Sequence, residues 1–192
     1  MKVFSLLYDR VIVWAKHRHA TYYLAGLSFA ESSFFPIPPD VMLAPMTLAR
    51  PHMGLRLALI TTIASVLGGA AGYLIGLWAI EAVMPLIEST GYLPAYERAQ
   101  DWFDSYGFFA VLAAGFSPIP YKVFTIAAGA VGLLMPVFLA ASVLGRGARF
   151  FLVAGLIAWG GEPMERRIRQ HVDILGWIFV AILIGGFVLL AR

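Results

Sequence analysis

Five charged side chains lie within otherwise apolar stretches of this 192-residue chain: Glu31, Asp40, Lys122, Arg146 and Arg149. An ionised group at the centre of a membrane helix costs at least about 2.5–3.5 kcal/mol on insertion scales, so such residues pair or line a wet cavity. Arg146 and Arg149 are three residues apart and therefore share one face of a helix. They predict an anion site together with Lys122, because a guanidinium group binds phosphate bidentately.

Glu31 and Asp40 predict proton exchange, because burial and cationic neighbours act in opposite directions on the protonation of a carboxyl group. Asp40 and Lys122 each follow a proline by four residues, so we expect these opposite charges to meet. The alternative is structural: the charges form ion pairs that fasten helices, or they bind frayed backbone groups.

The composition predicts an integral membrane protein. The chain is 60% hydrophobic and 13% charged, whereas soluble domains are about 45–50% apolar and about 25% charged. It has no cysteine, which excludes disulfides and thiolate metal sites. We find no nucleophile–base pair, metal-ligand spacing or glycine-rich phosphate loop, so we expect no enzyme activity, no metal and no cofactor. A basic nucleic-acid-binding face is excluded as well.

Two pairs of short apolar segments predict re-entrant hairpins. Residues 20–35 and 41–49 are each too short to span a bilayer, which needs about 20 apolar residues. Residues 108–117 and 123–135 form a second such pair. The predicted hairpin tips are marked by prolines: Pro36, Pro38 and Pro39 in the first, and Pro118 and Pro120 in the second. Non-helical backbone at membrane depth must be covered by protein or line a cavity.

The two halves of the chain are similar to each other. Pro36-Ile37-Pro38 recurs 82 residues later, and the Ala-Ser-Val-Leu-Gly run at 64–68 recurs 77 residues later. Each unit is a hairpin followed by one full span, at 55–79 and 136–161, so the second should enter from the opposite side. The predicted fold is therefore an all-α membrane protein, an inverted repeat of re-entrant helical hairpin plus transmembrane helix, with a C-terminal transmembrane helix.

The expected organisation has an N-terminal interfacial amphipathic helix over 1–19 and a membrane domain over 20–192. Within that domain, repeat one covers 20–80, repeat two covers 107–161 and the last transmembrane helix covers 174–191. The polar stretch 81–106 is expected to lie outside the bilayer. With the N-terminus in the cytoplasm, nine basic residues lie inside and two outside, which agrees with the positive-inside rule.

The hairpin motifs resemble those of a known family. Glu31 to Asp40, read E-S-S-F-F-P-I-P-P-D, is similar to the acidic, proline-containing hairpin of the DedA family, also called the VTT or SNARE-associated domain. Residues 115–129 and the G-R-G-A-R run at 145–149 resemble the YqaA-like branch. Many members have an R-F-x-P-x-x-R hairpin, whose first arginine is replaced here by Gly115, so we expect Arg146 or Arg149 to supply that charge.

The resemblance implies a protein of the bacterial cytoplasmic (inner) membrane that moves lipids between leaflets, as a flippase or scramblase, driven by the proton-motive force. Glu31 and Asp40 would couple protons, and Lys122, Arg146 and Arg149 would bind the phosphate of a phospholipid or of an undecaprenyl phosphate-like headgroup. Two other classes stay open: a proton- or cation-coupled carrier of a small soluble solute, and a non-transporting membrane-homeostasis protein. Assembly into a homo-oligomer is also left open.

Overall fold

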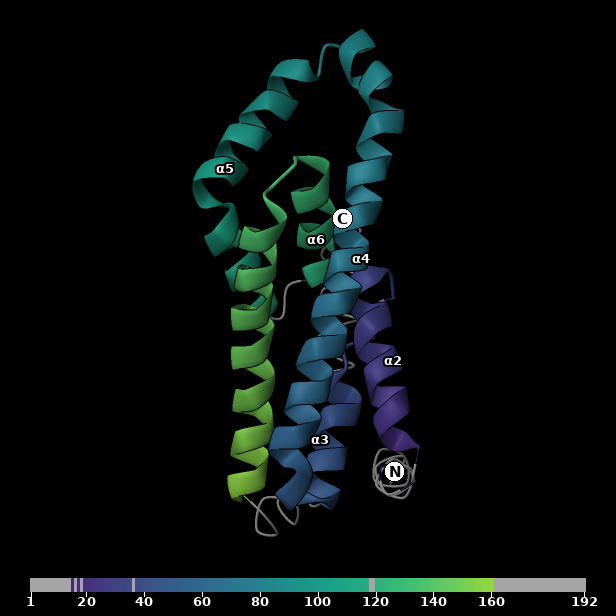
Figure 1. The fold of residues 1–192 in the computed structure, drawn as a ribbon, viewed down its shortest axis with the longest axis vertical. Coiled ribbons are helices and arrows are strands. Elements are labelled where there is room, and N and C mark those ends of the chain that lie inside the picture. The colour runs from purple at the N-terminus through teal and green to yellow at the C-terminus, as the bar shows by residue number, and fades with distance from the viewer. Residues whose placement is uncertain (1–14, 16, 18, 36, 118–119, 161–192) are drawn as a thin grey trace, which may run out of the picture.

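A computed structural model describes residues 15, 17, 19–35, 37–117 and 120–160 of the chain. Throughout these residues the regular structure is helical, as Figure 1 shows. Two of the helical segments, Pro51–Ser89 and Met135–Gly160, are long and apolar enough to cross a membrane. The predicted last transmembrane helix over 174–191, and nearly all of the predicted interfacial helix over 1–19, lie outside the described residues.

The first predicted hairpin is a pair of short helices, α2 (Ala20–Ser33) and α3 (Asp40–Ala49). The last residue of α2 is Ser33, and the next residue, Phe34, donates its amide to the Ala30 carbonyl. The prolines then break the helix, because a residue that precedes proline is disfavoured in the α conformation. α3 begins immediately after Pro39, whose carbonyl accepts from the Leu43 amide. At 14 and 10 residues, neither helix could span a bilayer alone.

The first long helix extends further than its sequence suggests. A 3-10 turn, η1 (Pro51–Met53), leads into α4 (Gly54–Ser89), which continues ten residues beyond the apolar run that ends at Ala79. Its 36 residues correspond to about 54 Å at 1.5 Å per residue, well over the roughly 30 Å of a hydrocarbon core. The end of α4 and the start of α5 form the projecting arch at the top of Figure 1.

The two helices of the second predicted hairpin differ more in length than those of the first. α5 (Leu93–Phe116) begins within the polar stretch 81–106, which is therefore mostly helical, and runs into the predicted apolar segment. α6 (Tyr121–Ala130) follows Pro120 and has ten residues. The chain then turns at Gly132, where φ is +77°, a conformation that glycine adopts without steric cost. The Met135–Gly160 helix begins directly after this turn.

Small residues let the short helices approach α4 closely. A Cβ at Gly68 would overlap the Phe29 carbonyl of α2, and a Cβ at Gly76 would overlap the Ile126 carbonyl of α6. Glycine at such positions is a common feature of helix contacts in membranes. α4 thus has α2 against one part of its surface and α6 against another (Figure 1).

A polar layer separates two apolar clusters in the core. One cluster is built around Leu24, Leu43 and Phe150, and the other around Tyr121 and Phe138. Along the two long helices, the buried polar positions fall between these clusters. This layer holds Ser32, Ser33, Thr61, Ser65, Thr125, Ser142 and Arg146, all of them buried. The candidate site lies in this layer.

Candidate functional site

Among the residues that the structure describes, the most deeply buried charge is Arg146, near the middle of the Met135–Gly160 helix. Its Nη2 forms an ion pair with the Glu31 carboxylate of α2, and the side chains are only 3% and 13% exposed. The same guanidinium donates from Nε to Ser65 Oγ at 2.6 Å and from Nη2 to Ser32 Oγ at 3.3 Å. A buried ion pair needs such further hydrogen bonds to offset the loss of water. α2, α4 and the Met135–Gly160 helix are therefore joined at one point.

Two aromatic rings lie against the Arg146 guanidinium. Its Cζ lies 4.8 Å from the ring centroid of Tyr121 and 4.7 Å from that of Phe150. The fully buried Tyr121 donates its hydroxyl to Ser142 Oγ at 2.5 Å, and Ser142 donates to the Phe138 carbonyl at 2.6 Å. Cation–π contacts reach about 2 kcal/mol or more when desolvated. Arg146 is thus fixed in place by stacking as well as by hydrogen bonds.

The second ion pair, Arg149–Asp40, is more accessible. Arg149 Nη2 lies 2.6 Å from Asp40 Oδ2, and the two side chains are 19% and 24% exposed. Arg149 also donates from Nη1 to the Ser117 carbonyl at 2.5 Å. Asp40 follows the first hairpin tip and Ser117 precedes the second, so one guanidinium bridges the two tips. The other oxygen of Asp40, Oδ1, is buried and has no hydrogen-bond partner among the described residues.

The structure corrects the expected pairing of Asp40 with Lys122. Asp40 binds Arg149 instead, while Lys122 Nζ lies 3.4 Å from the Phe34 carbonyl at the end of α2. The reason is the place of each residue on its helix. Asp40 is the first residue of α3, whose Leu43 and Met46 share an apolar cluster with Phe150, the residue after Arg149. Lys122 is in the first turn of α6, which also packs against α2, and it reaches the backbone at the end of that helix.

The described tip prolines mark the starts of α3 and α6. Pro38 and Pro120 are exposed, and Pro39 is buried. The carbonyls of Pro38 and Pro120 accept from the amides of Val41 and Val123, which closes the first turn of each short helix. Pro36 and Pro118 lie outside the described residues. The tips thus place Asp40 and Lys122 at helix starts, close to the polar layer.

Sequence reasoning missed the hydroxyl groups of the site, although a signal for two of them was present. Ser65 and Ser142 are the serines of the repeated Ala-Ser-Val-Leu-Gly run, and both belong to the network around Arg146. Ser32 joins it through Ser65, at 2.6 Å between the hydroxyl oxygens. A repeated polar residue inside two apolar helices marks a buried polar layer.

The arrangement can bind an anion or exchange protons. Two carboxylates neutralise two guanidinium groups, and Lys122 contributes a further positive charge close by. An incoming phosphate would compete with Asp40 for Arg149, because both are oxyanions that suit the guanidinium fork. Within the described part of the chain, no three histidine, aspartate or glutamate side chains gather as a metal ion would require.

Together, the fold and this site define a helical membrane protein with a charged centre. The family model described as the VTT domain matches residues 36–158, and the chain belongs to that family, the DedA family of the resemblance above. Its placement in the YqaA-like branch stays a prediction.

Two relatives are similar along almost their whole length. An uncharacterized protein of Haemophilus influenzae is 43% identical over 190 residues, covering 99% of each chain. A protein of Histophilus somni, described as an uncharacterized homolog, is 43% identical over 190 residues, covering 99% of this chain and 100% of the relative. No solved structure matches the chain.

Proposed function

We propose that this protein moves a phosphate-bearing lipid between the leaflets of the bacterial cytoplasmic membrane. The observation that carries the proposal is the position of the Arg149–Asp40 pair. It is about one-fifth exposed and joins the two hairpin tips, where Phe34 and Phe116 are 67% and 49% exposed. Charged groups beside exposed aromatic rings suit an amphipathic ligand, whose headgroup binds the charges while its tails stay in hydrocarbon.

The proposal includes the finer architecture of the membrane domain. We infer that α2–α3 and the second half of α5 with α6 are re-entrant hairpins, which enter from opposite sides as an inverted repeat. Their lengths support this, since α3 and α6 have ten residues each. In Figure 1 the first hairpin opens toward the end of the molecule marked N. The C-terminal end of α6 faces the opposite way, toward the arch. In transporters such broken elements meet at the substrate site.

The two ion pairs take different roles in this proposal. The Glu31–Arg146 pair is buried, and its guanidinium contacts two aromatic rings, so in this proposal it fixes the positions of the hairpins relative to each other. Asp40–Arg149 is accessible, so Arg149 binds the lipid phosphate after releasing Asp40, and Lys122 provides a second cationic contact. Protonation of Asp40 would weaken its hold on Arg149 and make the guanidinium available. Coupling to the proton-motive force follows from that exchange, with Glu31 as the second, less accessible acid.

The test is a lipid-translocation assay in proteoliposomes that contain a fluorescent phospholipid, read by an impermeant quencher. We expect Arg149→Gln to slow translocation at least tenfold, because it removes the accessible guanidinium. The matched control is Arg56→Gln, an exposed cation on α4 outside the site, which should stay within twofold of the wild type. A wild-type rate equal to that of protein-free vesicles, for every phosphate-bearing lipid tried, would reject lipid transport.

A charge swap separates transport from a purely structural role. Asp40→Arg/Arg149→Asp rebuilds an ion pair with its charges exchanged, but it puts the carboxylate where the phosphate would bind. We expect the swapped protein to fold and to lose translocation. Full translocation by the swapped protein would show that this ion pair only fastens the helices and does not bind the phosphate. Proton-driven uptake of a soluble solute without lipid movement would favour the solute carrier instead.

A further inference from the structure

The carbonyl groups at the C-terminal end of α6 are capped by side chains of α5. The last four carbonyl groups of a helix have no partner within it. In α6, those of residues 127–129 accept from backbone amides of the turn that follows. The fourth belongs to Ala130 and accepts from the Tyr96 hydroxyl at 2.8 Å. The carbonyl of the next residue, Val131, accepts from Gln100 Nε2 at 3.2 Å. The start of α5, which belongs to the arch, therefore completes the capping of α6.

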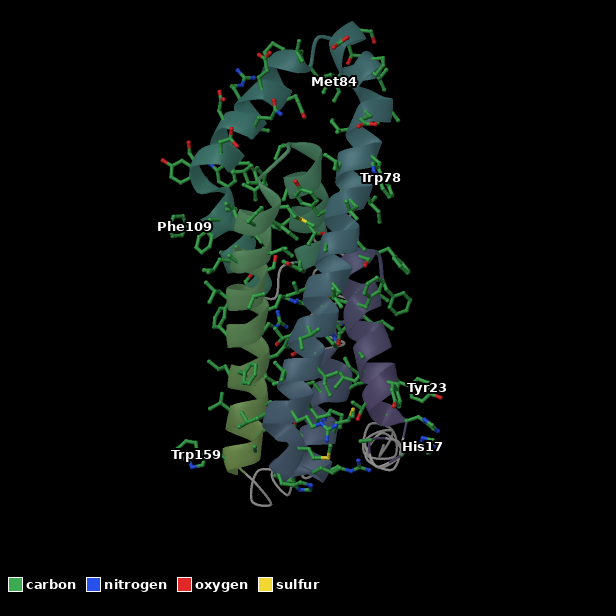
Figure 2. The ribbon with its side chains drawn as sticks, viewed as in Figure 1. His17, Tyr23, Trp78, Met84, Phe109 and Trp159 are labelled. Atoms are coloured by element: carbon green, nitrogen blue, oxygen red, sulfur yellow. The ribbon has the colours of Figure 1, made fainter. Side chains whose placement is uncertain are left out.

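One side of α5 is directed at this end of α6, and the two helices are in contact. Its residues recur at helical spacing: Tyr96, Gln100, Phe103 and Gly107. Phe103 is buried in the same apolar cluster as Leu133, and a Cβ at Gly107 would lie 2.9 Å from Leu133 Cδ1. On the opposite side of α5, Phe109 is 65% exposed and points away from the other helices (Figure 2). Apolar packing thus supports the two hydrogen bonds.

The opposite end of α6 lies in the candidate site. Tyr121 lies against the Arg146 guanidinium, and Lys122 reaches the Phe34 carbonyl. The ten residues of α6 correspond to about 15 Å at 1.5 Å per residue. Coupling between sites is carried by rigid secondary elements, and a helix of this length is such an element. A displacement of α6 at Ala130 is therefore transmitted to Lys122.

We propose that Tyr96 and Gln100, here called the α5 clamp, are positioning residues for lipid transport. Their hydrogen bonds fix the C-terminal end of α6, and α6 in turn holds Lys122 beside the Phe34 carbonyl, where it can contact the lipid phosphate. The transport part of this inference rests on the proposed function, whereas the effect of the clamp on the position of α6 does not. The arch, which supplies no residue to either ion pair, thereby gains a role in transport.

The position of α6 can be measured by double electron–electron resonance between two spin labels. The chain has no cysteine, so Leu55→Cys on α4 and Val123→Cys on α6, both at exposed positions, place one label on each helix. In this labelled protein, we expect Tyr96→Phe/Gln100→Leu to widen the distance distribution at least twofold, because two hydrogen bonds that hold α6 are lost.

A double-mutant cycle links the clamp to transport. In the proteoliposome assay, Lys122→Gln and Tyr96→Phe/Gln100→Leu should each slow lipid translocation at least threefold. The triple variant should be no slower than the clamp variant, because both changes remove the same contact of Lys122. Factors that multiply in the triple variant would mean that the clamp does not act through Lys122, and they would overturn its role in transport.

The matched control is Tyr92→Phe/Tyr106→Phe, which removes two exposed hydroxyls from the same segment. It should leave the distance distribution unchanged and the translocation rate within twofold of the wild type. An unchanged distribution in the clamp variant, or an equal change in the control, would overturn the proposal. If the clamp variant does not fold, Gln100→Leu alone decides by the same two measurements. A wild type that moves no lipid rejects the proposed function and the transport role of the clamp, whereas the distance measurement still decides whether the clamp positions α6.

Discussion

The two arginines of the Met135–Gly160 helix differ in what surrounds them, although they are only three residues apart. Arg146 has two aromatic rings, two serines and a carboxylate around its guanidinium. Arg149 has one carboxylate and one carbonyl, and it is partly exposed. Removal of one partner from a buried pair leaves an uncompensated charge in the core. Stability and transport should therefore depend on different arginines.

Arg146→Gln is expected to lower the free energy of unfolding by about 3–5 kcal/mol, because Glu31 would stay buried without its cation. Arg149→Gln should lower the free energy of unfolding by less than half as much, because its partner, Asp40, is partly exposed. Unfolding of the purified protein in detergent measures both losses. Glu31→Gln/Arg146→Gln should regain part of the loss, because no charge is then left alone. Equal losses for the two single variants would contradict the assignment of Arg146 as the structural arginine.

The ring of Tyr121 is expected to contribute more to the stability of the protein than its hydroxyl does. Tyr121→Phe keeps the ring against Arg146 and removes one hydrogen bond to Ser142, so it should lose about 1 kcal/mol of unfolding free energy. Tyr121→Leu also removes the cation–π contact and should lose at least about 2 kcal/mol more. The same unfolding measurement compares them. Equal losses of unfolding free energy in Tyr121→Phe and Tyr121→Leu would show that the hydroxyl network contributes more to stability than the cation–π contact.

The charged residues of the candidate site could be recognised in the sequence, but the partner of each one could not. Five charges in apolar segments indicated a polar centre, and the structure brings all five to the hairpins and the helix beside them. Which acid meets which base depends on how α3 packs beside Arg149 and how α6 packs against α2, which the sequence does not show. Equivalent repeat positions suggested Asp40 with Lys122, but equivalent positions need not be neighbours. The serines were missed because serine also occurs in apolar helices without a site.

Among the helices, prolines and glycines decide where chains turn and how closely they pack. The proline clusters correctly predicted where the short helices stop and start. The length of α4 was underestimated, because Glu81 and Pro85 ended the apolar pattern although the backbone stays helical to Ser89. A helix that leaves the bilayer no longer needs apolar side chains, so hydropathy cannot show its end.

The contact of α4 with α6 is expected to depend on Gly76. In Gly76→Ala, the added Cβ overlaps the Ile126 carbonyl, which is backbone and cannot rotate away. We expect a loss of about 1–3 kcal/mol, as for other overpacked contacts, measured by thermal unfolding in detergent. The matched control is Gly155→Ala on the Met135–Gly160 helix, where a Cβ has no atom within 4 Å. Equal stability of the two variants would contradict this close packing.

For the molecule as a whole, the predicted orientation in the membrane, with the N-terminus in the cytoplasm, can be tested by cysteine labelling. It has no cysteine, so a single introduced cysteine gives a clean labelling site. We expect an impermeant maleimide to label Gly91→Cys, in the turn between α4 and α5, in intact spheroplasts. His52→Cys, in η1, should react only after the membrane is opened. The reverse pattern would place the N-terminus outside and reject the orientation drawn from the positive-inside rule.

The unbroken length of α4 has a mechanical consequence. The helix contacts the first hairpin through Ser65 and Gly68 and the second through Gly76, and its last turns extend past all these contacts. A small tilt at the hairpins therefore becomes a larger displacement at Ser89. A spectroscopic label near that end would therefore report rearrangements at the polar layer without touching the residues that cause them.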